Sequence, residues 1–104
     1  MSTFNNAVVA GVGTTASNVY AATSTTVFLE LDVANSSAAD VTANVTLTQG
    51  ATTAYLVKMA TIPTGSAIQV IAGQKIVLKS GDYIRIQSSA ASSLDAVGSV
   101  LEGV

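Results

Sequence analysis

Few residues of this chain could take part in catalysis. The sequence has no histidine and no cysteine, and its 104 residues include only four basic and six acidic side chains. Glu30 and Asp32 are two residues apart and would share one face of a strand, where paired carboxylates can exchange protons or bind a hard cation. Nothing else in the sequence completes such a site. We therefore interpret the pair as a solvated face or as an ion-pair face between subunits.

Two short patterns are similar to motifs of enzymes. Residues 11–16, GVGTTA, fit the dinucleotide fingerprint G-x-G-x-x-A, which requires a helix directly after the glycines. The residues that follow are β-rich, which favours a glycine-rich bend between strands. Lys79 and Ser80 are adjacent, so on a strand their side chains point to opposite faces and cannot exchange a proton. The sequence therefore predicts no enzyme, no metal site and no cofactor.

Charge is scarce in this chain, at 10% of residues against about 25% in typical domains. The cations Lys58, Lys75, Lys79 and Arg85 are too few for the basic stripe of a nucleic-acid-binding protein. No apolar run approaches the roughly 20 residues that span a bilayer. Residues 1–20 contain no Lys or Arg, so they lack the basic start of a secretory signal. We expect a partner that is neither nucleic acid nor membrane.

Alternation of apolar and polar residues runs through most of the chain and predicts strands. In residues 41–48, VTANVTLT, the apolar side chains fall on one face and the polar ones on the other. Turn residues recur every 8–12 positions, and no segment has the 3.6-residue repeat of an amphipathic helix. We expect an all-β fold, a single β-sandwich or jelly-roll-like domain of about eight or nine short strands over residues 1–104. Residues 1–12 would be an extended N-terminal strand or a docking arm.

The turns contribute two further expectations. Residues 35–39, NSSAA, and residues 80–82, SGD, each lie between two alternating segments, and we interpret both connections as hairpins. Asp40, Asp82 and Asp95 lie at turns or strand starts, where a carboxylate accepts hydrogen bonds from backbone N–H groups.

The aromatic side chains are the candidates for a contact surface. Phe28, Tyr55 and Tyr83 are out of phase with the leucine and isoleucine residues next to them, so alternation places them on the less apolar face of their strands. Aromatic anchors on that face fit an assembly interface. Large apolar side chains are few, so a thin core also favours self-association. The alternative is a bulge, which would invert the faces of a strand and make its ring a core residue.

Several short segments between Gly11 and Glu102 form a further pattern, and none of them is a catalytic motif. They are GTT followed by VY (residues 13–20), LDVAN (31–35), VTLT (45–48), the P-x-G-S turn (63–66), LKSGDYI (78–84) and SSAASSLD with the closing S-x-L-E (88–102). Together these segments resemble those of small β-rich structural proteins from the virions of tailed bacteriophages, a group that includes capsid decoration or cement proteins.

The resemblance implies a non-enzymatic virion protein that is made in the host cytoplasm and assembles as a homotrimer. Its leading interpretation is a decoration protein that binds the major capsid protein, or another virion protein, and stabilises the shell. An adaptor of the neck, tail, baseplate or fibre is the alternative within this class. From a different class we keep a carbohydrate-binding β-sandwich module, in which Tyr20, Tyr55 and Tyr83 would supply the aromatic platforms.

Overall fold

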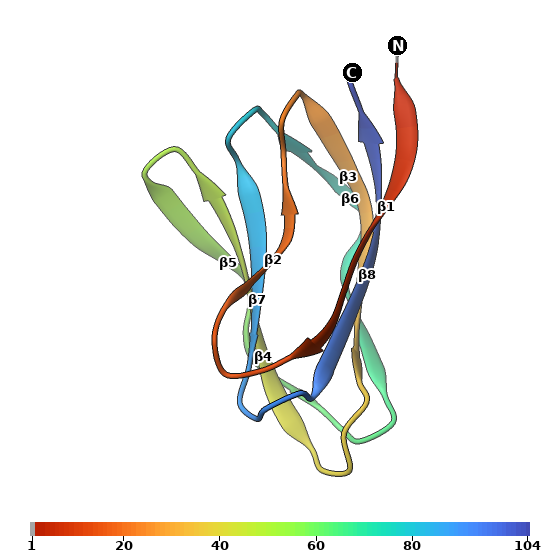
Figure 1. The fold of residues 1–104 in the computed structure, drawn as a ribbon, viewed down its shortest axis with the longest axis vertical. Helices are drawn as coiled ribbons and strands as arrows, with labels where there is room; N and C mark the ends of the chain where they lie inside the picture. The colour runs from red at the N-terminus through yellow and green to blue at the C-terminus, as the bar shows by residue number, and fades with distance from the viewer. Residues whose placement is uncertain (1) are drawn as a thin grey trace.

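The computed structural model describes residues 2–104 and consists of two four-stranded antiparallel sheets packed face to face (Figure 1). This architecture confirms the all-β prediction. One sheet has the strand order β1-β8-β3-β6, formed by β1 (Thr3–Val12), β8 (Leu94–Glu102), β3 (Thr26–Asn35) and β6 (Ala67–Leu78). The other has the order β2-β7-β4-β5, formed by β2 (Ser17–Ala21), β7 (Tyr83–Ser88), β4 (Val41–Gln49) and β5 (Thr52–Ile62).

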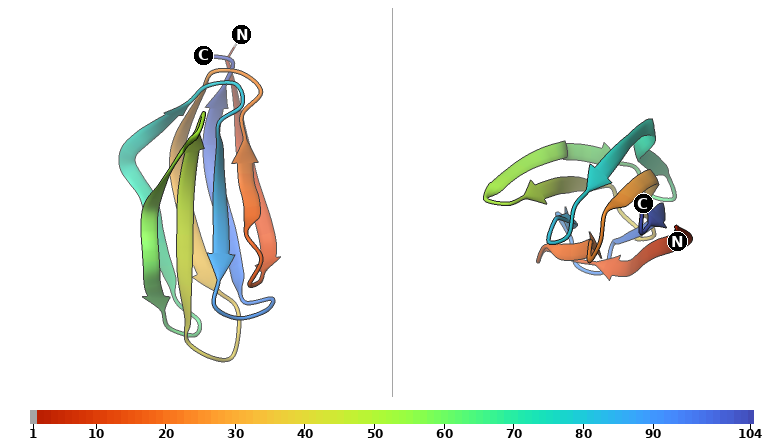
Figure 2. Two further views of the ribbon diagram at one scale, coloured as in Figure 1. Left: turned by 90° about the vertical axis from the view of Figure 1, so that its left-hand side faces the viewer. Right: turned by 90° about the horizontal axis from the view of Figure 1, so that it is seen from above.

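The strand pairs are nested along the chain. β1 pairs with β8, β2 with β7, β3 with β6 and β4 with β5, all antiparallel. The chain is therefore one long hairpin rolled into two layers, which is the jelly-roll topology. Nesting also brings the two ends of the chain side by side at one end of an elongated molecule, as Figures 1 and 2 show. Within residues 2–104 no helix is long and apolar enough to cross a bilayer.

The prediction of two hairpins is wrong. The connection after β3 leads to β4, and the connection after β6 leads to β7, and in both cases the second strand belongs to the opposite sheet. These turns are arches between layers, which allows Leu78 and Ile84 on either side of an arch to face the same core. The hairpin of the fold is β4–β5, where Gly50 takes a φ of 61° in the turn.

The core lies between the two sheets. Val41, Ala43 and Val45 on β4 and Ile84 and Ile86 on β7 point inward and are buried, as their alternation predicts. From the other sheet come several of the largest fully buried side chains: Phe28, Leu31, Leu78, Ile71 and Leu94.

A bulge in β3 inverts the predicted faces of that strand. Phe28 pairs with Val100 and Glu30 pairs with Ser99, so Leu29 is an extra residue without a partner on β8. Before the bulge the even-numbered residue faces the core, and after it the odd-numbered residues do. Phe28 is 0% exposed. The placement of Phe28 on an outer face is therefore wrong, because its ring is a core residue and cannot anchor an assembly interface.

The turn carboxylates act as predicted. Asp40 accepts a hydrogen bond from the backbone N–H of Thr64 at 3.0 Å, and Asp95 accepts one from that of Gly11 at 2.9 Å. In the arch after β6, Asp82 accepts one from the N–H of Lys79 at 2.9 Å. These contacts fix the ends of strands at both ends of the sandwich.

Residues 3–12 of the proposed N-terminal strand or docking arm form β1, an edge strand paired with β8, while Met1 lies outside the described residues. The glycine-rich stretch at residues 11–16 joins β1 to β2. Gly11 has a φ of 65°, and the chain continues into a strand rather than a helix. The stretch therefore lacks the helix N-terminus that would hold a pyrophosphate.

Candidate assembly surfaces

One row of apolar side chains crosses the outer face of the β1-β8-β3-β6 sheet over all four strands, while the exposed carboxylates Asp32 and Glu30 lie opposite Val97 and Ser99 in the neighbouring rows. Phe4 on β1 lies opposite Leu101 on β8, Leu101 lies opposite Val27 on β3, and Val27 lies opposite Val77 on β6. The side chain of Phe4 is 75% exposed and that of Val77 is 53% exposed. We call this surface the apolar face; it comprises Phe4, Val8, Val27, Val77, Val97 and Leu101.

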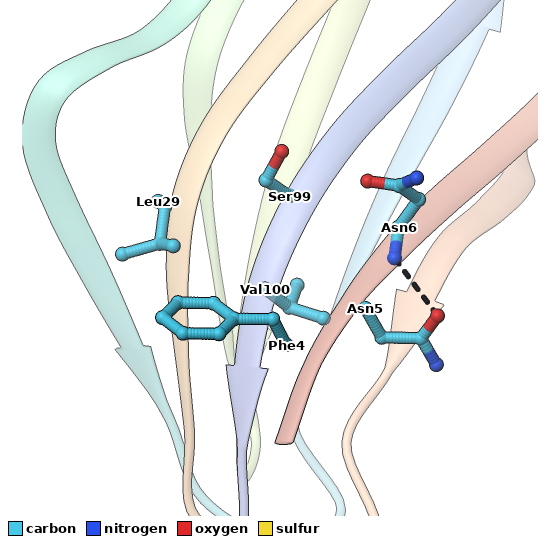
Figure 3. Close-up of a pocket in the computed structure, with 6 residues that line it drawn as sticks. All are labelled: Phe4, Asn5, Asn6, Leu29, Ser99 and Val100. Atoms are coloured by element: carbon cyan, nitrogen blue, oxygen red, sulfur yellow. Dashed lines mark hydrogen bonds between the residues drawn. The ribbon is translucent and has the colours of Figure 1, made fainter. Parts of the chain in front are cut away.

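A groove of about 450 Å³ lies beside the apolar face and is lined by residues of β1, β8 and β3. The bulge residue Leu29 turns its side chain into this groove, and the ring of Phe4 extends from β1 across β8 toward it (Figure 3). The remaining lining residues are Asn5, Asn6, Ser99 and Val100. The bulge that buries Phe28 therefore also adds an apolar side chain to the outer face.

The outer face of the β2-β7-β4-β5 sheet is polar and carries two tyrosines. A row of paired residues crosses it from Asn18 through Arg85 and Thr46 to Tyr55. The Arg85 side chain lies 4.5 Å from the ring centre of Tyr83 and donates from Nε to Oδ1 of Asn18 at 2.9 Å. We call this surface the tyrosine face; it comprises Tyr55, Tyr83, Arg85, Lys58, Asn44 and Thr46.

Cation–π contacts hold both tyrosine rings of this face. Lys58 Nζ lies 5.1 Å from the ring centre of Tyr55, whose side chain is 54% exposed. A small hollow of about 40 Å³ beside Tyr55 is lined by Ala16, Asn44, Thr46, Arg85, Ile86 and Gln87. Hydroxyl, amide and guanidinium groups around an aromatic ring can bind a polar ligand by hydrogen bonds and stacking.

The three predicted anchors therefore do not come together. Tyr55 and Tyr83 lie on the outer face of one sheet, as their alternation indicates, while Phe28 lies in the core beneath the other sheet. The alternation pattern of the sequence does not predict the residues of the apolar face as a contact surface. Their signal is the adjacent apolar pair, as in Val27-Phe28, where one side chain enters the core and its neighbour must face out.

Tyr20 belongs to neither face. Its hydroxyl donates a hydrogen bond to Glu102 Oε2 between the sheets, and its ring meets that of Phe28 edge-on at 6.0 Å between centres. Burial raises the pKa of Tyr20 above its ordinary value of about 10, and the hydrogen bond to Glu102 raises it further. Because it faces inward, Tyr20 cannot join Tyr55 and Tyr83 in one aromatic platform.

No group of three or more His, Cys, Asp or Glu residues lies close enough to hold a metal ion in residues 2–104. Across the same residues, every buried side-chain nitrogen or oxygen has a hydrogen-bond partner. The sequence matches no protein-family model and no curated protein sequence.

Proposed function

We propose that this chain is a non-enzymatic virion structural protein that decorates a capsid shell and cements its subunits. The observation that carries the proposal is the apolar face, which extends over all four strands of one sheet. Exposed apolar areas of this kind mark surfaces that a partner covers. The resemblance to small phage virion proteins supplies the class of partner, a capsid protein.

The surface chemistry supports a partner that binds without strong charge. The chain has ten charged residues, four basic and six acidic. Covering a nearly neutral surface avoids the large desolvation cost of burying ions. Occupancy on a shell should therefore change little between low and high salt. The jelly roll adds only an analogy, because viral capsid proteins, lectins and cupins all use it.

The cement role is tested on particles prepared with and without the protein. A protein that binds only the assembled shell stabilises it by about 2.7 kcal/mol per site when its concentration is a hundred times the dissociation constant. Particles that carry the protein should survive heating that opens bare particles. Val77→Ser with Val97→Ser on the apolar face should abolish both binding and protection, whereas Tyr55→Ser should preserve them. Equal robustness of bare and decorated particles would refute the cement role.

An adaptor of the neck, tail, baseplate or fibre would use the same apolar face for a different virion partner. The position of the chain on an intact particle separates the two roles. Density over the shell lattice supports cement, and density confined to the tail or neck supports an adaptor.

A carbohydrate-binding module is the second candidate, and the tyrosine face favours it. Tyr55 and Tyr83 share one surface with the amide of Asn44 and the hydroxyl of Thr46. Glycan-array binding that Tyr55→Ser abolishes, with the apolar-face variant unaffected, would support this function over cement.

A further inference from the structure

β1 is the least protected of the four sheet edges in residues 2–104. β2 has only five residues. β5 carries Lys58 followed by Met59 at a φ of 51°, and its pairing with β4 shifts register twice. β6 carries Gly73 and Lys75 at positive φ and also shifts register twice against β3. Short length, lysine and bulges are the features by which sheet edges avoid adding a further strand.

β1 lacks these protective features over most of its length. The strand has ten residues, TFNNAVVAGV, without a charge or a proline. Its pairing with β8 is regular from residue 3 to residue 9, and the register shifts only beyond Val9. Seven of its ten residues are exposed. Its free edge therefore carries no charge, proline or bulge from residue 3 to residue 9 that would oppose another strand.

A hydrogen bond of Asn6 indicates which residues of β1 direct their backbone N–H and C=O groups to the free edge. The backbone N–H of Asn6 donates to Oδ1 of Asn5 at 2.9 Å (Figure 3). In an antiparallel strand, the residues that bond to one neighbour alternate with those that face the other side. Phe4, Asn6 and Val8 therefore present their backbone groups to the free edge and their side chains to the outer surface.

We infer that β1 pairs antiparallel with β1 of a second copy about a two-fold axis at Asn6. Residues 3–9 are centred on Asn6, so this register uses the whole regular part of the strand. It places Phe4 opposite Val8 of the second copy and Asn6 opposite itself, and it forms about six backbone hydrogen bonds. The β1-β8-β3-β6 sheets of the two copies then form one continuous sheet, and their apolar faces form one continuous surface.

Charge and topology favour a second copy as the occupant. β1 contains no charged residue, so pairing with itself brings no like charges together. The lysines and bulges on β5 and β6 oppose head-to-tail addition of β1 to another edge. An isologous pair closes with two copies. The inference therefore differs from the homotrimer that the resemblance implies, and it does not rest on the cement role.

Cysteine substitution tests the register directly, because the chain has no cysteine of its own. In the paired strands the two copies of residue 6 would lie about 5.5 Å apart between Cα atoms, within the roughly 4.4–6.8 Å that a disulfide spans. Under mild oxidation, Asn6→Cys should give at least tenfold more disulfide-linked dimer than Val8→Cys, which lies opposite residue 4. Val97→Cys on β8 is the second control, exposed on the same face but away from the edge.

Sedimentation equilibrium of the unmodified chain provides the second measurement. One strand pair buries less area than the about 800 Å² per partner of a standard interface, so we expect a micromolar Kd. At protein concentrations above this Kd, the measured mass should approach twice 10.4 kDa. Val8→Lys should weaken the dimer at least tenfold, and Val97→Lys should not. A monomer at high micromolar concentration, a trimer, or equal crosslinking of the three cysteine variants would each overturn the inference.

Discussion

The aromatic ring of Phe28 occupies the space that a side chain on Gly98 would need. A Cβ atom built on Gly98 would lie 2.7 Å from two ring carbons of Phe28 and 2.9 Å from the carbonyl oxygen of Glu30. Glycine at this point of β8 therefore allows the ring to pack directly against the backbone of the neighbouring strand. The bulge in β3 and the glycine in β8 form one packing arrangement.

Gly98→Ala should therefore destabilise the domain although it adds only one methyl group. The Phe28 ring is fully buried and the nearby carbonyl belongs to the backbone, so neither can move freely. We expect a loss of about 1–3 kcal/mol in the free energy of unfolding, measured by urea titration. Ser99→Ala, the next residue along β8, is the matched control and should change stability by less than about 0.5 kcal/mol. An unchanged midpoint for Gly98→Ala would show that the ring has room to shift.

Phe28 and Phe4 should respond in opposite ways to substitution by serine. Phe28→Ser removes a ring from the core and should cost about 3–5 kcal/mol of folding stability. Phe4→Ser alters a 75% exposed side chain and should change stability by less than about 0.5 kcal/mol, while it removes part of the apolar face. Thermal unfolding and a binding measurement on both variants separate the two roles. Similar losses of stability would contradict the assignment of Phe28 to the core and Phe4 to the surface.

The sequence is informative wherever polar residues mark the outer side of a strand. Residues 41–45 alternate with Thr42 and Asn44 outside, and the structure buries Val41, Ala43 and Val45. In β3 the run Val27-Phe28-Leu29 has no polar residue, so nothing in the sequence reveals where the bulge falls. The error at Phe28 follows from this gap, because one extra residue exchanges the two faces.

The two wrongly predicted hairpins have a different physical origin. A turn such as Ser80-Gly81-Asp82 stabilises a reversal of the chain through local contacts, such as the hydrogen bond from the N–H of Asp82 to the carbonyl of Lys79 at 2.9 Å. Those contacts are compatible with a hairpin and with an arch between sheets. The choice depends on pairing between strands far apart in the sequence, such as β3 with β6, which no local pattern encodes.

Asn35 is a buried polar residue whose substitution should destabilise the fold. It is 2% exposed, and its Nδ2 donates to the carbonyls of Ile62 at 2.9 Å and Ala39 at 2.8 Å, while Oδ1 accepts from the N–H of Ser37. Asn35→Ala leaves these groups unpaired and should cost about 2 kcal/mol of unfolding free energy. Asn18→Ala, which removes an exposed contact to Arg85, is the control and should cost under about 0.5 kcal/mol. Equal effects of the two variants would contradict a structural role for Asn35.

Removing the side chain of Asn5 should strengthen the proposed pairing of β1. Oδ1 of Asn5 occupies the N–H of Asn6, and Nδ2 lies 3.4 Å from Glu102 Oε1, so the side chain competes with an incoming strand at the centre of the edge. Asn5→Ala should lower the Kd of the dimer several-fold in sedimentation equilibrium. Thr3→Ala, an exposed residue of the same strand, should leave the Kd unchanged. Weaker association of Asn5→Ala would mean that Asn5 supports the pairing instead of opposing it.

Stability should fall at high pH because of Tyr20. Burial and the hydrogen bond to Glu102 raise its pKa in the folded state above the value of about 10 expected in the unfolded chain. Above pH 10 the unfolded chain loses this proton while the folded protein still holds it. The folded state then binds more protons than the unfolded state, so a rise in pH lowers the free energy of unfolding. The contribution is complete below about pH 10 and is lost as the pH rises through the folded pKa. Tyr20→Phe should flatten this decline in urea unfolding between pH 8 and 11, and Glu102→Gln should flatten it partly, because burial of the ring persists. A decline as steep in Tyr20→Phe as in the unmodified chain would assign the effect to other groups.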